Sequence, residues 1–207
     1  MYETVTVREL TAPILRKDEI IRYSGGSSED EATARLIDSC VRELLPTLSY
    51  KVCYGETAVS VCGDTASICG CETVSKSLSK YLADCERAIV FGATVGLSPD
   101  RLIKKYSRIS PSRALIISAI GSERVEALCD TFCRELGEEY AKKGALLSPR
   151  FSAGYGDLSL GLQKYIFETL GLTRHLGVTL NDSLLMTPAK SVTAIMAIRP
   201  KKDKEQL

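Results

Sequence analysis

The sequence predicts an α+β fold with a largely antiparallel sheet flanked by helices. Helix-like and strand-like segments do not alternate strictly along the chain, which disfavours a doubly wound parallel sheet. Segments with alternating apolar residues occur in the first third and again near the C-terminal end, as is typical of antiparallel strands. With 207 residues, 44% of them apolar, the chain can bury one core. We therefore expect a single domain over residues 1–198 and a charged tail over 199–207, RPKKDKEQL.

Two helices and a strand pair are predicted first. Ile20 to Tyr23 precede SGGSS, so a short helix should close at Gly25. The stretch SSEDEATARLIDSCVRELLP predicts an amphipathic helix that ends near Pro46, and its apolar stripe comprises Ile37, Cys40, Val41, Leu44 and Leu45. YKVCYGETAVSVCG alternates apolar and polar residues on both sides of Gly55-Glu56, which we interpret as a turn between antiparallel strands.

The middle of the chain predicts three helices and a buried strand. A helical face is expected from Val74, Leu78, Tyr81, Leu82 and Cys85, and AIVFGATVG is a short buried strand that leads into a glycine loop. Ser98-Pro99 and Ser110-Pro111 each combine a capping residue with proline, so helices should begin at these prolines. The helix that begins at Pro111 keeps its apolar spacing up to Gly144, with Gly121 as a weak point.

The last third predicts one helix and two strands. Leu162, Tyr165, Ile166 and Leu170 form an apolar stripe that Gly171 ends. SLLMTPAKSVTAIMAI indicates two apolar strands around the segment 187–190.

The charge and hydropathy of the chain exclude several classes of protein. Lys and Arg number 27 against 26 Asp and Glu, a net charge of +1, so no global field attracts nucleic acid or anionic lipid. No run of eighteen apolar residues occurs, and the amino terminus mixes charged and apolar residues. We expect a soluble, cytoplasmic protein without a secretion signal.

The eight cysteines are expected to be reduced thiols, most of them in the core. Cys62, Cys69 and Cys71, with Cys53 nearby, leave a zinc or iron–sulfur site as an alternative, although their spacing matches no common ligand pattern. Cys129 and Cys133 share one face of a predicted helix and suit core packing.

Three other motifs favour structural interpretations. GATVG, residues 92–96, lacks the features of a phosphate-binding loop and is read as a strand-to-helix turn. His175, the only histidine, has no nucleophile near it in sequence. Glu138-Glu139 is typical of a solvated helix face.

The segment RFSAGYGDLSLGLQKYIFETLG, residues 150–171, is the strongest candidate site. Arg150 offers a rigid fork of donors that suits a carboxylate. Gly154 and Gly156 permit unusual backbone conformations, and Tyr155 supplies an aromatic face that attracts a cation. A zwitterion with a second positive centre would satisfy all three. The alternative is that Arg150 pairs with a structural acid and the glycines only turn the chain.

The segment around Arg150 and a second motif near the C-terminal end resemble motifs of a known protein family. Arg-x-x-x-Gly-Tyr at 150–155 and Ser-x-x-Met-x-Pro-x-x-Ser-Val at 183–192 resemble the activation domain of cobalamin-dependent methionine synthase, in its short free-standing form. The match is clear over about the last sixty residues, and Gly92 to Leu97 and GSERVEALCD are similar more loosely. The resemblance implies a C-shaped α+β domain with a twisted antiparallel sheet.

The resemblance also implies a ligand and a role. Arg150 would hold the carboxylate of S-adenosylmethionine, Ser152 and Gly154 would make main-chain contacts, and Tyr155 would lie near the ligand and a docked corrin. The implied function is that of an S-adenosylmethionine-binding accessory protein for the reductive reactivation of cobalamin in methionine synthase. Cobalamin would be carried by a separate methionine synthase chain, and flavodoxin or another donor would supply one electron. Any enzymatic activity would belong to the methyltransferase as a whole. The accessory protein would position the methyl donor and would need no catalytic acid or base of its own.

The chain departs from the family pattern in places. Ala153 stands where the family often has proline, and the paired tyrosines beyond the final strand are missing. Asp18 and Asp38 are the candidates for the family's amino-terminal aspartate. A module of the same fold that has lost its ligand, and a cysteine-based metal or redox protein, are therefore the alternative functions.

Overall fold

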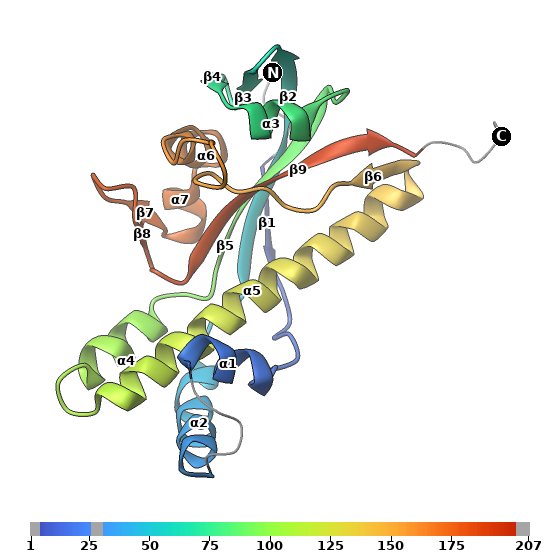
Figure 1. Cartoon of the computed structure of the whole chain (residues 1–207). Coiled ribbons are helices and arrows are strands. Elements are labelled where there is room, and N and C mark those ends of the chain that lie inside the picture. Colours follow the sequence, from blue (N-terminus) through green and yellow to red (C-terminus); the bar gives the residue numbers. More distant parts are fainter. Residues whose placement is uncertain (1–4, 26–30, 202–207) are drawn as a thin grey trace.

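The structure of the chain is a computed structural model that describes residues 5–25 and 31–201. Its centre is a seven-stranded sheet in which every pairing is antiparallel (Figure 1). The long strands β2 (Lys51–Cys62), β5 (Arg87–Thr94) and β9 (Ser191–Pro200) lie side by side in that order. The shorter strands are β1 (Thr6–Glu9), β3 (Thr65–Ile68), β4 (Cys71–Val74) and β6 (Ala145–Leu147). The predicted α+β fold with an antiparallel sheet is confirmed.

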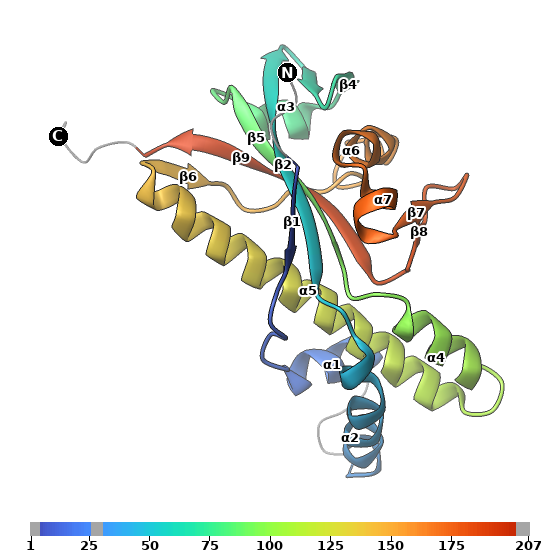
Figure 2. The ribbon, with the colours of Figure 1, turned by 180° about the vertical axis from the view of Figure 1, so that it is seen from behind.

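Helices cover both faces of this sheet. On one face lies α5 (Pro111–Lys142), which runs obliquely across the strands (Figures 1 and 2). The other face carries α3 (Lys76–Leu82), α6 (Leu162–Leu170) and α7 (Leu172–Leu176), together with the small hairpin β7 (Thr179–Leu180) and β8 (Met186–Thr187). The remaining helices, α1 (Lys17–Ser24), α2 (Glu31–Leu44) and α4 (Ser98–Tyr106), pack around the first half of α5, and the 3₁₀ turn Leu45–Thr47 follows α2.

Strand alternation separates the core into two layers. In β5, Ile89 and Phe91 face α5, whereas Ala88 and Val90 face α3 and α6. All four side chains are fully buried. A strand that is buried on both faces has a continuous apolar run, which is why AIVFGATVG could be identified as a buried strand.

Helix ends agree well with the sequence. Gly25 and Gly171 terminate α1 and α6 in the left-handed conformation, with φ of 68° and 57°. Ser110 is the N-cap of α5 and Pro111 begins the helix, as predicted. Gly121 does not interrupt α5, since the helix is continuous through it.

The predicted turn at Gly55-Glu56 is wrong. β2 continues through both residues, and Gly55 pairs with Val90 in the middle of β5. The chain turns instead after Cys62, where Gly63 has φ of 58°. The alternating pattern is the same for one twelve-residue strand as for two short ones, so only pairing with β5 distinguishes them.

Other boundaries also differ from the predictions. Val74 belongs to β4 and is 73% exposed, so α3 begins only at Lys76. Ser98 is already inside α4, whose N-cap is Leu97. The strand expected over SLLM is reduced to Met186–Thr187. Arg199 and Pro200, assigned to the tail, pair with β6 at the end of β9, and residues 202–207 lie outside the described part of the chain.

Candidate functional site

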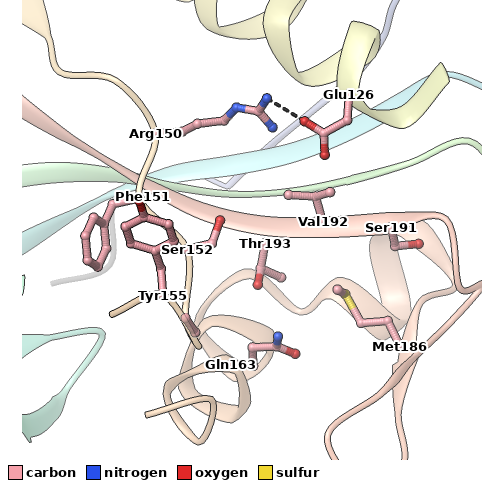
Figure 3. A pocket seen from close by; sticks show the side chains of 11 residues that line it. Glu126, Arg150, Phe151, Ser152, Tyr155, Gln163, Met186, Ser191, Val192 and Thr193 are labelled. Carbon is pink, nitrogen blue, oxygen red and sulfur yellow. Dashed lines mark hydrogen bonds and ion pairs between the residues drawn. The ribbon is translucent and has the colours of Figure 1, made fainter. Parts of the chain in front are cut away.

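A pocket of about 720 Å³ opens between α5, the segment that follows β6, and the start of β9 (Figure 3). The residues around it come from several separate segments between positions 126 and 193. It is lined by Glu126, Arg150, Phe151, Ser152, Ala153, Tyr155, Gln163, Met186, Ser191, Val192 and Thr193.

The segment after β6 enters the pocket because it pairs with the edge of β9. Phe151 and Ile195 exchange both main-chain hydrogen bonds, at 2.9 and 2.8 Å. Neighbouring side chains on an extended segment point to opposite faces. Phe151 accordingly packs into the core on the α6 side, and Arg150 points toward α5.

Arg150 forms ion pairs with two acids of α5. Its Nη2 lies 2.6 Å from Oε2 of Glu126 and 3.0 Å from Oδ1 of Asp130. Burial disfavours the charged guanidinium, but the negative groups around it more than offset this and raise the pKa of Arg150. Glu126 and Asp130 are four residues apart, so both carboxylates lie on one face of α5, and Glu126 lines the pocket. Arg150 therefore does pair with acids of the fold, the arrangement that sequence reasoning left open.

Tyr155 is held by a row of aromatic rings. Tyr81 stacks on Phe151 with ring centres 5.0 Å apart, and Phe151 meets the edge of Tyr155 at 5.6 Å. The hydroxyl of Tyr81 donates to the carbonyl of Pro149 and accepts from the amide of Ala197, and burial raises its pKa to about 12. Tyr155 itself remains 70% exposed at the mouth of the pocket, so one face of its ring is open to a ligand.

The Gly-Tyr-Gly turn has a defined conformation. Gly154 and Gly156 have φ of 86° and 60°, which other residues rarely adopt. The amide of Gly154 donates to the carbonyl of Leu158 at 3.0 Å, and the amide of Tyr155 donates to the carbonyl of Ser152 at 3.2 Å. Asp157 then accepts hydrogen bonds from Ser75 and from the main chain at the start of α3, which anchors the turn to that helix.

The structure brings together most of the site residues chosen from the sequence. Arg150, Ser152 and Tyr155 all line the same pocket. Gly154 shapes the turn without lining the pocket, and its amide is occupied within the turn. A main-chain contact from that amide to a ligand would require the turn to open.

Sequence reasoning missed Glu126, Gln163 and Thr193. These three come from α5, α6 and β9, and each has local spacing that is compatible with ordinary surface or core positions. One signal was available, because Ser122, Glu126 and Asp130 recur every four residues and form a polar stripe along the middle of α5, where most other residues are buried.

The other candidates lie outside the pocket. Neither Asp18 nor Asp38 lines it, and Asp38 pairs with Lys17 at 2.6 Å. His175 lies in α7 beside Gly171. Gly92 is inside β5 and Gly96, with φ of 85°, turns the chain toward α4, in agreement with the structural interpretation of GATVG.

The cysteines do not form a ligand cluster in the described residues. Cys53 and Cys69 are buried, Cys71 is partly buried and Cys62 is exposed. No group of three or more potential metal ligands occurs in residues 5–25 and 31–201. Burial raises the pKa of both Cys53 and Cys69 to about 11, which disfavours the thiolate that a metal would need.

Comparisons with known proteins bear on the fold. No known family model matches the sequence, and no curated protein matches it. Among solved structures, the crystal structure of the MetH reactivation domain bound to AdoHcy is similar, with a TM-score of 0.68 and 17% identity over 97% of this chain and 80% of that one. The chain has the fold of the MetH reactivation domain. Within the described residues, no helix is both long and apolar enough to cross a membrane.

Proposed function

We propose that this chain binds S-adenosylmethionine and acts in trans as an accessory protein for reactivating the cobalamin of a methionine synthase. The observation that carries the proposal is the Arg150–Glu126 pair at one end of a pocket whose mouth holds Tyr155. The fold of the MetH reactivation domain, solved with AdoHcy bound, supports the same ligand class.

The pocket matches the charges of the amino-acid part of this ligand. The guanidinium of Arg150 suits its carboxylate, and the carboxylate of Glu126 suits its ammonium group. Without ligand the two side chains neutralise each other at 2.6 Å, so neither charge is left uncompensated in a half-buried position. A zwitterion can replace this contact with two contacts of the same kind. The sulfonium would then lie between this charged end and the open face of Tyr155.

Methyl transfer would require positioning rather than acid–base catalysis. S-adenosylmethionine would give its methyl group to cobalamin carried by the partner chain, which would first receive one electron from flavodoxin or another donor. The displaced product is the neutral thioether S-adenosylhomocysteine, so no proton has to move. Holding the donor in line with its acceptor is the contribution expected of these residues.

The mouth of the pocket lies at the protein surface, beside exposed apolar side chains that a large partner could contact. The mouth is formed by Tyr155, and Leu185 beside Met186 on the β7–β8 hairpin is 62% exposed. Exposed apolar side chains around a ligand site are typical of interaction surfaces. We assign this rim to the cobalamin-binding module of the partner.

Titration calorimetry with S-adenosylmethionine tests the ligand. Loss of a charged hydrogen bond costs about 1.5–3 kcal/mol, so Arg150→Ala should weaken binding roughly tenfold to a hundredfold. Arg134→Ala is a matched control, because Arg134 is an exposed arginine of α5 that pairs with Glu135 and Glu138 of its own helix. If the wild type does not bind at millimolar ligand, the chain is instead a module that has lost its ligand.

The trans role needs a second experiment. Oxidised cobalamin bound to a separate methionine synthase module is mixed with an electron donor and S-adenosylmethionine, and methylcobalamin is followed by its absorption spectrum. Addition of this chain should accelerate methylcobalamin formation, and the Arg150→Ala variant should need roughly tenfold to a hundredfold more S-adenosylmethionine for the same effect. Equal rates with and without the chain would exclude the trans role even if the ligand binds.

A further inference from the structure

Two buried polar groups on the pocket wall have no hydrogen-bond partner in the part of the chain that the structure describes. The side-chain oxygens Oγ1 of Thr193 and Oε1 of Gln163 are inaccessible to solvent and unpaired in the described part of the chain. Both residues are more than nine-tenths buried and both line the pocket. Buried polar atoms are normally paired, since leaving one unpaired is unfavourable. Ser191, their neighbour on the same wall, is satisfied by Thr94 and by the carbonyl of Pro188 at 2.8 Å each.

The main chain adds further free groups beside Thr193. Ile195 directs its amide and carbonyl away from β5, toward Phe151. In an antiparallel strand the residue two positions away directs its own groups to the same edge. Thr193 therefore presents its N–H and C=O at this edge, and no described strand pairs with it there, because β6 reaches only Ile198–Pro200.

These groups lie apart from the charged end of the pocket. In Figure 3, Gln163 and Met186 occupy the end opposite Arg150 and Glu126, and Thr193 lies between the two ends. A ligand whose amino-acid part contacts Arg150 would extend past Thr193 toward Gln163. Under the proposed function, the remaining part of that ligand is adenosine.

We infer that Gln163 and Thr193 recognise the adenosine of the ligand, Gln163 through the adenine edge and Thr193 through the ribose. A glutamine amide offers one acceptor and a donor pair, which match the N6 amino group and N7 of adenine. The hydroxyl of Thr193 can both donate to and accept from a ribose hydroxyl. Met186 supplies an adaptable apolar surface with a sulfur atom suited to an aromatic ring. This assignment rests on the proposed binding of S-adenosylmethionine.

Calorimetry with S-adenosylhomocysteine and S-inosylhomocysteine tests the base contact, because hypoxanthine replaces the N6 donor with an oxygen acceptor. The wild type should prefer the adenine compound by about tenfold or more. Gln163→Met, which keeps the length of the side chain, should weaken binding of the adenine compound about tenfold and reduce the preference to near one. Lys164→Ala, an exposed neighbour on α6, should leave both affinities unchanged.

Thr193→Val tests the second contact with little change of shape. It should weaken both compounds equally, by about fivefold to tenfold, and leave the base preference intact. Ser79→Ala is the matched control, because Ser79 also has a buried hydroxyl with no partner among the described residues but lies outside the pocket. Thermal unfolding of each variant separates a binding defect from a folding defect.

The outcomes separate this inference from the proposed function. Equal wild-type affinity for the two compounds, with Arg150→Ala still impaired, would overturn the base assignment and leave the function in place. The base assignment would also be overturned if folded Gln163→Met kept the wild-type preference for the adenine compound. If the wild type binds neither compound, both the adenosine assignment and the proposed function would be refuted.

Discussion

A buried ion pair within α5, Glu123 and Arg124, forms hydrogen bonds to the amino-terminal segment. Breaking this ion pair should destabilise the whole chain. The side chains of Glu123 and Arg124 are 0% and 1% exposed. Arg124 donates to Glu123 and also to the carbonyls of Pro13 and Ile14, at 2.6 and 2.8 Å. Glu123 in turn accepts from the amide of Arg16. Burial disfavours the guanidinium charge, but its bonds to Glu123 outweigh this and raise the pKa of Arg124.

Arg124→Met should therefore lower the free energy of unfolding by about 3–5 kcal/mol. The substitution removes the cation that contacts Glu123 most closely and leaves Arg16, whose Nε is 3.9 Å from this buried carboxylate. Removal of one partner of a buried ion pair costs about this much. Two carbonyls also lose their partner, although such losses do not simply add. For a chain of about 200 residues, each kcal/mol lowers Tm by about 2–4 °C, so Tm should fall by about 6–20 °C.

Thermal and urea unfolding followed by circular dichroism measure this effect. Arg134→Met, at an exposed position on the same helix, should change stability by less than about 0.5 kcal/mol. The double variant Glu123→Leu with Arg124→Met should recover part of the loss, because no unpaired charge remains buried. A folded Arg124→Met variant within about 1 kcal/mol of the wild type would refute this reasoning, and so would a double variant less stable than the single one.

Two further predictions concern stability. Hydrogen bonds from Ser75 and Ser77 lower the pKa of Asp157 below its ordinary 3.8, so its contribution is present above that pH and is lost as pH falls below about 4. Asp157→Asn should lower Tm at pH 7, and the difference from the wild type should shrink toward pH 2; a constant difference in a Tm series would contradict this. Gly92→Ala places a methyl group 2.7 Å from Leu172, and differential scanning calorimetry should show a loss of about 1–3 kcal/mol. Gly137→Ala, with nothing within 4 Å, should instead gain about 0.5–1 kcal/mol, and equal effects of the two alanines would argue against the packing explanation.

The helices α1, α5 and α6 were predicted well because their limits depend on nearby residues, whereas α7 was not predicted. Gly25 and Gly171 end helices through their own backbone conformation, and Pro111 begins α5 because its missing amide needs no partner there. Strand limits were predicted less well. Whether the chain turns or continues at Gly55 depends on β5, because its partner Val90 lies 35 positions away and pairs with it only in the folded chain.

Some residues of the candidate site were also predictable from the sequence, whereas others were found only in the structure. Arg150, Gly154 and Tyr155 belong to one short segment, so their residue types and their resemblance to a known motif could be recognised together. Glu126, Gln163 and Thr193 come from three separate elements. Nothing in their local sequence indicates that they face one pocket, because that depends on the crossing of α5 over the sheet and on the free edge of β9.

The sequence by itself determined the α+β class, the main helices and the segment around Arg150, since periodicity, capping residues and turn glycines act over a few residues. Only the tertiary structure decided that β2 is one continuous strand and that Arg150 meets Glu126 and Asp130. It also decided that side-chain oxygens of Thr193 and Gln163 on the same wall find no partner within residues 5–25 and 31–201. Hydrogen bonding and ion pairing require atoms to come within about 3 Å, and for residues far apart in the chain that proximity exists only after folding.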